Sequence, residues 1–330
     1  MRKVLGFVLA VLCVLSFAAC SNQTQGGSDA CAHQLEQTES YCIKQGAETE
    51  ELYTAKKCSL CKELVAQEKV SGEIVSDQKE ISTAIQKVEK GGVVFFKKGS
   101  YIQVSALKAL EDVIFYAENG TLIHKIEFKS ENGCKNVTID NFEFVSDSNG
   151  AGVIFACNMD GITIKNSSFE GYSRIANLDG SDFAIKNLTV TDCKFNNIKR
   201  QNKLTAIRVT LLENFSLINS SFDGVEYNAV QVGGKELRGK VNIEGNTFKN
   251  TVDRVIRLAN NKSTSCEIKD NTFYDNNDCE NTGVYIHCGG GKCTLGANVW
   301  ETMPLFNKQE FIGIDERLLI YDASQQKLLG

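Results

Sequence analysis

The sequence predicts an all-β solenoid, on three observations. A nine-residue phrase recurs seven times, as NVTIDNFEF, GITIKNSSF, NLTVTDCKF, NFSLINSSF, KVNIEGNTF, SCEIKDNTF and KCTLGANVW. Its copies start 25 to 27 residues apart, which is the length of one supersecondary unit in repeat proteins. Positions 2 and 4 of the phrase are apolar between polar neighbours, the period-2 pattern of a strand with one buried face. Stacked units therefore turn each position of the phrase into a column of side chains.

Residues 1–19 are predicted to be a lipoprotein signal peptide. Arg2 and Lys3 precede an apolar stretch too short for a transmembrane helix, and small residues then lead to Cys20. This ending resembles a bacterial lipobox, with Phe17 where leucine is more usual, and it predicts a lipid on Cys20. An ordinary secretory signal is the alternative. The lipid predicts a protein anchored to the cell envelope, at the outer membrane or the surface of a bacterium.

Two segments separate the signal peptide from the solenoid. Residues 20–30 are polar and glycine-rich, which predicts a flexible tether. Residues 31–76 are charged and poor in glycine, which predicts short helices. Four cysteines there predict a disulfide framework with three possible connectivities: Cys31, Cys42, Cys58 and Cys61. A zinc site is the alternative, disfavoured because no histidine lies at ligand spacing.

Residues 77–330 are predicted to form the solenoid, with a helix over its start and final strands over its end. One apolar stripe predicts a helix over 77–90, ended by two glycines: Ile81, Ala84, Ile85 and Val88. The runs GGVVFFKKGSY and DVIFYAENGTLI then predict strands. This helix, the Gly-Gly strand, the Gly-x-Tyr turn and the V-x-I-x-N-x-x-F turns resemble the right-handed parallel β-helix of the pectin lyase-like superfamily. The resemblance implies that fold with an N-terminal helical cap, and it leaves the activity open because lyases, hydrolases, epimerases, adhesins and binding proteins share the fold.

Three positions of the phrase are predicted to be structural. Position 6 holds Asn, Asp, Gly or Ala and predicts a sharp turn after the strand. Position 7 predicts a partial amide ladder of Asn246, Asn271 and Asn298. Position 9 predicts an internal ring stack of Phe144, Phe169, Phe195, Phe222, Phe248, Phe273 and Trp300. Cys266 and Cys293 share position 2 and are predicted to be buried free thiols.

A second strand lies between the phrases, and its outward residues form the predicted functional surface, because the resemblance implies a substrate groove along this sheet. The alternation predicts a central column of Arg208, Gln231, Arg257 and Tyr285. Flanking columns are predicted to hold Thr205, Asn228 and Arg254 on one side and Thr210, Gly233, Ala259 and His287 on the other. Arg174 is predicted to join from the preceding turn.

This surface predicts binding of an acidic polysaccharide such as a uronan. Arginine forks bind carboxylate or sulfate bidentately, so the predicted substrate-binding residues are Arg174, Asn228, Gln231 and Arg254. The alternative is that arginine simply fills exposed strand positions. The protein has 330 residues and a formal net charge of −5. Removal of the signal peptide takes away Arg2 and Lys3 and changes the net charge to −7. Such an acidic chain is not expected to bind nucleic acid.

Two further function classes stay open, a polysaccharide lyase and a non-catalytic structural or adhesive protein. In β-elimination, Arg208 or Arg257 would neutralise the uronate carboxylate or act as base, and Tyr285 with His287 would supply acid and base. Glycoside hydrolysis is disfavoured because it needs two carboxylates, and no Asp or Glu is expected on these outward positions.

No cofactor is predicted. Calcium would need clustered carboxylates, and the nearby acids Asp223, Glu226 and Asp253 form no motif. The run HCGGGKC from His287 invites a metal, but its last cysteine is expected to point inward, and a disulfide between Cys279 and Cys288 is simpler.

Overall fold

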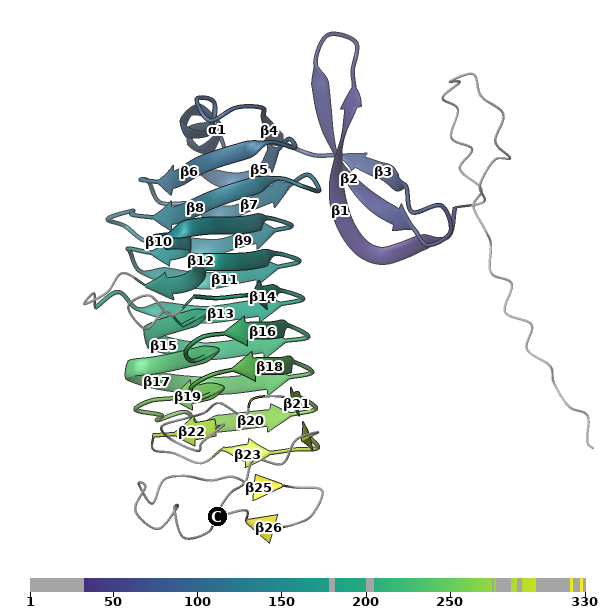
Figure 1. Ribbon diagram of the computed structural model, residues 1–330. Coiled ribbons are helices and arrows are strands. Elements are labelled where there is room, and N and C mark those ends of the chain that lie inside the picture. The colour runs from purple at the N-terminus through teal and green to yellow at the C-terminus, as the bar shows by residue number, and fades with distance from the viewer. Residues whose placement is uncertain are drawn as a thin grey trace, which may run out of the picture.

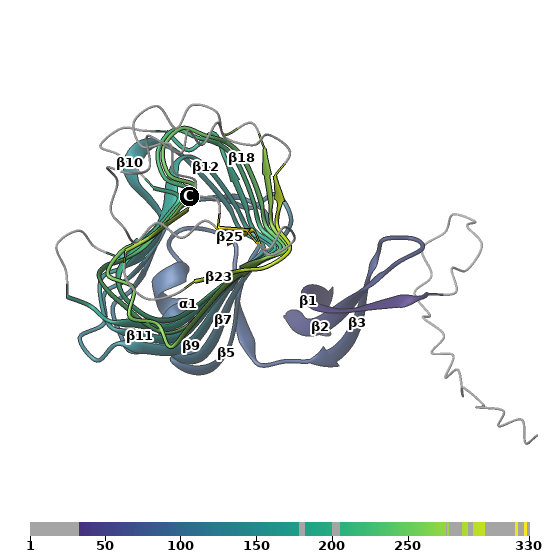
Figure 2. The same cartoon turned by 90° about the horizontal axis from the view of Figure 1, so that it is seen from below.

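A computed structural model of the protein describes residues 33–177, 182–199, 205–274, 276, 286–289, 293–300, 321–322 and 327–328. The described chain forms a parallel solenoid, a single helix and a separate three-stranded antiparallel sheet (Figure 1). Each turn of the solenoid contributes to up to three parallel sheets, whose strands enclose one continuous apolar core (Figure 2). The predicted all-β solenoid is therefore confirmed.

The first sheet contains the phrase strands. It comprises β4 (Gly72–Val75), β5 (Lys90–Phe96), β7 (Glu111–Ala117), β9 (Cys134–Asp140), β11 (Met159–Lys165), β13 (Ile185–Thr191), the ends of β15 (Ile207–Ile218) and β17 (Val230–Glu244), β20 (Ser265–Lys269) and β23 (Thr294–Leu295). Among the side chains that the structure describes, those at phrase positions 2 and 4 are buried in it, as predicted.

The second sheet follows the turn at phrase position 6. It comprises the starts of β6 (Ser100–Ala106), β8 (Leu122–Phe128), β10 (Glu143–Phe155) and β12 (Ser168–Asn177), then β14 (Lys194–Asn196), β16 (Ser221–Val225), β18 (Thr247–Thr251), β21 (Thr272–Tyr274) and β24 (Val299–Trp300). The third sheet comprises the ends of β6, β8, β10 and β12, the starts of β15 and β17, then β19 (Ile256–Leu258) and β22 (Ile286–Cys288).

The turn at phrase position 6 has the predicted left-handed backbone. Asn166 has φ 51° and Asp192 φ 53°, values that Asn and Asp tolerate because their short side chains bond locally. At Gly245, with φ 68°, a Cβ would lie 2.5 Å from Oδ1 of Asn219 on the preceding turn, so this position also needs glycine for space.

The predicted ring stack is confirmed inside the coil. Successive rings lie 4.5 to 5.1 Å apart and nearly parallel from Phe144 to Phe273, and Trp300 continues the register opposite Phe273. The predicted amide ladder is also confirmed. Oδ1 of Asn271 accepts from the backbone N–H of Asn246 at 2.9 Å, and Oδ1 of Asn298 accepts from the N–H of Asn271 at 3.0 Å. Both columns therefore stabilise the stacking of turns.

Helix α1 (Ile81–Lys87) lies within the predicted helix of residues 77–90. Its predicted stripe is buried and belongs to the core cluster of the solenoid: Ile81, Ala84, Ile85 and Val88. The helix packs against β4 and β6, inside the outline of the coil viewed along its axis (Figure 2).

The prediction of short helices over 31–76 is wrong. The described part of this segment forms β1 (Leu35–Gln45), β2 (Glu50–Cys58) and β3 (Leu64–Lys69), which pair antiparallel, before β4 joins the solenoid. This sheet packs on the outer face of the first turns, where Leu52 meets Val93, Phe95 and Tyr116. Tyr41 and Tyr116 make an edge-on ring contact at 5.1 Å between centroids. The apolar contact to the solenoid favours strands over isolated helices here.

The predicted disulfide framework is not found either: within the described part of this segment, no disulfide joins Cys42, Cys58 and Cys61 to one another. Cys31 and the predicted partner Cys279 lie outside the described residues. Cys266 and Cys293 are both buried, as predicted, and the Sγ atom of Cys293 contacts that of Cys266 at 2.6 Å.

After residue 300 the structure describes two short strands, β25 (Tyr321–Asp322) and β26 (Lys327–Leu328), which pair antiparallel. These two strands lie in the region where final strands were predicted to cover the end of the coil, and the rest of that region lies outside the described residues. Among the helices of the described chain, none has the length and apolar character needed to cross a membrane.

Candidate functional site

The predicted central column lies on the outer face of the third sheet. Arg208 of β15 pairs with Gln231 of β17, and Gln231 pairs with Arg257 of β19. Their neighbours Ile207 and Val209 point into the core, while these three side chains are half-buried on the outside. We call Arg208, Gln231 and Arg257 the arginine strip. Because parallel strands are about 4.8 Å apart, its two guanidinium-bearing residues are about 10 Å apart along the coil.

In the backbone ladder between β19 and β22, Arg257 pairs with His287, which was predicted to lie in a flanking column. Tyr285 lies outside the described residues. The connection from Arg257 to His287 is longer than the one from Gln231 to Arg257, and this extra length shifts the register by two residues.

Arg174 belongs to a neighbouring column. It lies opposite Gly152, while Ala176 lies opposite Arg208. Its column runs from Lys125 through Gly152, and its side chain is almost completely buried. Arg174 is thus beside the arginine strip and one turn before it, close to its predicted place.

Asn228 and Thr205 are not outward residues, contrary to the predicted flanking column. Both are fully buried at the corner where the chain enters the third sheet. Nδ2 of Asn228 donates a hydrogen bond of 3.0 Å to Oε1 of Gln231. That bond occupies the amide oxygen of Gln231. The NH₂ group of Gln231 is therefore the part of the amide that faces outward. Asn228 therefore positions a binding residue and does not contact a ligand itself.

Within the described chain, two arginines of this surface have no protein partner for their guanidinium groups. In the described chain neither Arg254 nor Arg257 takes part in an ion pair, and the Nε atom of each is buried without a hydrogen-bond acceptor. Buried donors are normally hydrogen-bonded, so such groups call for an explanation in function. The arginine strip thus presents hydrogen-bond donors and no carboxylate, which suits an anionic ligand.

A family model for the right-handed β-helix region matches residues 126–299, more than half of the chain. The chain belongs to the right-handed β-helix family. The matched region contains the first six phrases, the seventh except for Trp300, the stacked rings from Phe144 to Phe273 and the arginine strip.

Among solved structures, this β-helix is similar to a tailspike protein from the Acinetobacter baumannii bacteriophage Fri1, described as a capsular polysaccharide depolymerase. The similarity covers 88% of this chain and 78% of the tailspike chain, at 9% identity and a TM-score of 0.29. A likeness this distant carries no argument about activity. Among curated proteins, no sequence matches the chain.

Sequence reasoning missed one acidic residue in the strip's column. The column runs from Ser105 through Glu127, Ile154 and Ala176 to Arg208. Glu127 is 5% exposed and pairs with Lys125 at 3.2 Å and Lys129 at 3.0 Å. It lies about 14 Å from the start of the arginine strip, counted as three strand spacings. The alternation in HKIEFK, with Ile126 and Phe128 inward, was the signal that could have found it.

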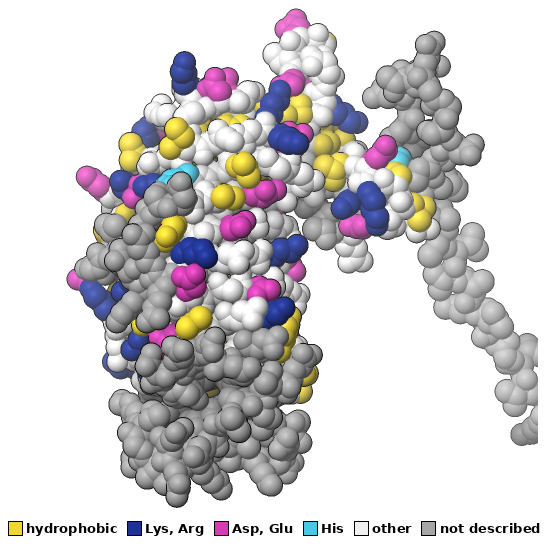
Figure 3. Space-filling view, viewed as in Figure 1, with side chains coloured by type: hydrophobic (Ala, Val, Ile, Leu, Met, Phe, Trp, Pro, Cys, Tyr) yellow, Lys and Arg dark blue, Asp and Glu magenta, His cyan; other side chains and the backbone are white. Residues whose placement is uncertain are grey.

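A cleft of about 490 Å³ lies elsewhere, between the N-terminal sheet and the first turn of the β-helix. Three of the four glutamates that line it pair with lysine: Glu50 with Lys97 at 2.6 Å, Glu51 with Lys69 at 2.6 Å and Glu73 with Lys87 at 2.8 Å. The fourth, Glu80, accepts a hydrogen bond from the backbone N–H of Ser76 at 2.6 Å. On the face seen in Figure 3, basic and acidic side chains are likewise interspersed over the described atoms. In the arginine strip, by contrast, two arginines and a glutamine follow one another on adjacent strands with no acidic side chain between them.

Proposed function

We propose that the β-helix binds an acidic polysaccharide along the arginine strip. The observation that carries the proposal is the half-buried guanidinium of Arg257, which has no ion pair in the described chain and lies one strand from the outward NH₂ group of Gln231. A desolvated guanidinium gains most from a bidentate carboxylate or sulfate.

An elongated polymer fits this surface better than a compact ligand. Donors recur from turn to turn on a flat sheet, so a chain that carries anionic groups at intervals can contact several turns at once. The described strands of this sheet from β12 to β19 carry no Asp or Glu at outward positions. Such a surface favours an anion over a neutral glycan.

Cleavage of that polymer by β-elimination is the second candidate, supported by the register of His287 with Arg257. In that reaction Arg257 would stabilise the uronate carboxylate while a neighbouring base removes the proton next to it. A non-catalytic structural or adhesive role is the third.

One experiment separates the three. The purified protein is incubated with a panel of uronans, sulfated glycans and neutral glycans, and both binding and the absorbance of unsaturated product are recorded. We expect binding to anionic glycans only, weakened about tenfold to a hundredfold in Arg257→Ala, the cost of charge-assisted hydrogen bonds. Arg257→Lys should recover part of the affinity, because it keeps the charge and loses the fork.

Arg238→Ala is the matched control, because Arg238 is an exposed arginine on the first sheet, paired with Glu236 at 2.6 Å. Equal losses in Arg238→Ala and Arg257→Ala would reject the arginine strip as the binding site. Unsaturated product that disappears in Arg257→Ala would establish the lyase. The absence of binding to every glycan would favour the structural role.

We also propose that Cys20 carries a lipid that anchors the protein to the cell envelope. The basic start, the apolar stretch and the small residues before Cys20 support this. Metabolic labelling with a fatty acid should mark the wild-type protein and not Cys20→Ser, which should leave the membrane fraction. An unlabelled wild-type protein would refute the anchor.

We propose, finally, that α1 caps the first turn of the solenoid, which its buried Ile81 and Ile85 support. Ile85→Asp should expose the first turns to protease before the rest of the coil. Uniform protection along the chain would contradict a capping role.

A further inference from the structure

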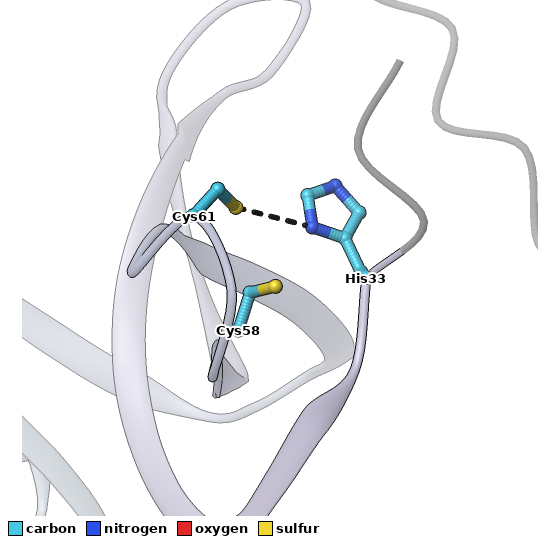
Figure 4. A group of neighbouring side chains, drawn as sticks. All are labelled: His33, Cys58 and Cys61. Carbon is cyan, nitrogen blue, oxygen red and sulfur yellow. Dashed lines mark hydrogen bonds between the residues drawn. The ribbon is translucent and has the colours of Figure 1, made fainter. Parts of the chain in front are cut away.

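Three side chains that bind soft metal ions lie together at one end of the N-terminal sheet (Figure 4). One ligand atom each from His33, Cys58 and Cys61 lies within 4.8 Å of the others. Nδ1 of His33 is 3.4 Å from Sγ of Cys61. Cys58 is buried and the other two are half-buried, so the group is shielded but reachable from solvent.

Strand pairing brings these residues together from positions 25 residues apart in the sequence. Leu35 at the start of β1 pairs with Cys58 at the end of β2, and His33 lies two residues before Leu35. The backbone N–H of Ser59 donates to the carbonyl of Gln34 at 2.8 Å, which fixes the histidine strand to the cysteine turn. Zinc was disfavoured on sequence spacing for want of a nearby histidine, and this pairing places His33 beside the two cysteines.

The turn that carries the two cysteines is itself closed by hydrogen bonds. The N–H of Cys58 donates to the carbonyl of Glu63 at 2.8 Å, and the N–H of Lys62 donates to the carbonyl of Cys58 at 2.9 Å. Lys62 has the left-handed φ of 65°, which turns the chain back toward β3. Both thiols are therefore held on a turn whose shape does not depend on an ion, as a preorganised site requires.

Several donors surround the sulfur of Cys58. It accepts hydrogen bonds from the backbone N–H groups of Cys61 and Leu60, from the His33 ring and from the thiol of Cys61. Cys42, the other thiol of the same sheet, lies outside the cluster.

We propose that His33, Cys58 and Cys61 bind one Zn²⁺ ion. Two sulfurs and one imidazole nitrogen are a soft donor set that selects zinc over calcium or magnesium, and they leave the fourth tetrahedral position to water or a further ligand. Binding converts both thiols to thiolates and releases their protons to the buffer. The ion would tie the start of β1 to the turn between β2 and β3. The site is independent of the arginine strip.

The test uses the full chain, purified under reducing conditions, with zinc measured by mass spectrometry and Co²⁺ used as an absorbing substitute. We expect one zinc per chain and a thiolate-to-cobalt charge-transfer band. Cys58→Ser and Cys61→Ser should lose the band, and His33→Ala should bind at least about tenfold more weakly. Cys31, two residues before His33 in the sequence, lies outside the described residues and is unchanged in every variant.

Cys42→Ser is the matched control, because it removes a thiol from the same sheet and should keep both the zinc and the band. Far-ultraviolet circular dichroism of each variant checks that the β-helix is intact. Three results would each overturn the site: a wild-type chain without bound zinc or a cobalt band, a Cys58–Cys61 disulfide in the reduced preparation, or zinc retained at full affinity in the double variant Cys58→Ser/Cys61→Ser.

Discussion

Nδ2 of Asn228 donates to Oε1 of Gln231 across 3.0 Å, from a fully buried position to a half-buried one. This contact fixes which end of the Gln231 amide faces the ligand side of the sheet. Because the oxygen is occupied, the outward group is a donor between two arginines. The buried Asn228 thus determines that Gln231 presents a donor, and not an acceptor, in the arginine strip.

Asn228→Asp tests that dependence. An aspartate at this position accepts and does not donate, so the Gln231 amide should turn and present its oxygen to the anion. We expect acidic glycan to bind about fivefold more weakly, the equivalent of about 1 kcal/mol, measured by calorimetry at constant salt. Asn228→Ala, which adds no buried charge, should show a smaller loss. Asn196→Asp on the outer face of the second sheet is the control, and an equal loss there would exclude the proposed role.

Phe195 tests the ring stack. Its ring is fully buried between Phe169 at 4.7 Å and Phe222 at 4.5 Å, so Phe195→Ala leaves a cavity on both sides. We expect the free energy of unfolding to fall by about 3–5 kcal/mol, measured by denaturant titration. The exposed Leu107→Ala should change it by less than about 0.5 kcal/mol. A loss at Phe195 as small as at Leu107 would mean that the coil relaxes around the missing ring.

Asn271 tests the amide ladder. Its Nδ2 donates to the carbonyl of Ile243 at 2.9 Å, and its Oδ1 accepts from the N–H of Asn246. Asn271→Ala leaves both backbone groups buried without a partner, each at a cost of about 1–3 kcal/mol. Thermal unfolding should therefore begin at a lower temperature than in the half-buried Asn242→Ala. An unchanged melting temperature would show that water replaces the amide.

Asp140 gives the solenoid a pH-dependent stability. Burial raises the pKa of this carboxyl, while hydrogen bonding from Asn166 and the charge of Lys165 partly oppose the shift. The folded state therefore holds the proton more tightly than the unfolded chain. The stability from Asp140 is full below the ordinary pKa of 3.8 and is lost as the pH rises through the higher folded-state pKa.

Asp140→Asn removes this titration. The free energy of unfolding of the wild type should decrease relative to the variant as the pH rises from about 4, with a constant difference at lower pH. Denaturant titrations at a series of pH values measure the difference. Parallel profiles across this range would show that Asp140 titrates alike in both states.

The repeat made most of the solenoid predictable from the sequence. The alternation of Val137 and Ile139 with polar neighbours, the left-handed residue at Asn141 and the ring at Phe144 are local signals, each repeated at the same spacing. Repetition turns weak local signals into a column that can be checked at every turn.

The N-terminal sheet was not predictable in the same way. In β2 the buried residues are Leu52, Ala55 and Cys58, three apart, which imitates the spacing of a helix. The pairing with β1 and the contact with Tyr116 decide the structure, and the spacing within β2 reveals neither of them. The metal-ligand cluster was missed for the same reason, because only this pairing places His33 beside Cys61.

The candidate site was predictable from the sequence only in part. Arg208, Gln231 and Arg257 were placed correctly because each lies between two inward apolar residues. Asn228 lies before the strand begins, so the alternation cannot be extended to it. His287 follows a connection of different length, and counting residues across such a connection loses the register.

The constant register of the phrases has a consequence for how such a chain can change in length. Phe195 meets Phe222 as Phe222 meets Phe248, so any turn is interchangeable with the next at its inner columns. Duplication or loss of one whole turn restores every column, whereas an insertion of a single residue in a strand would turn inward side chains to the outside. Evolution can therefore lengthen the coil in whole-turn steps, and every acquired turn brings a fresh outer strand on which new specificity can arise.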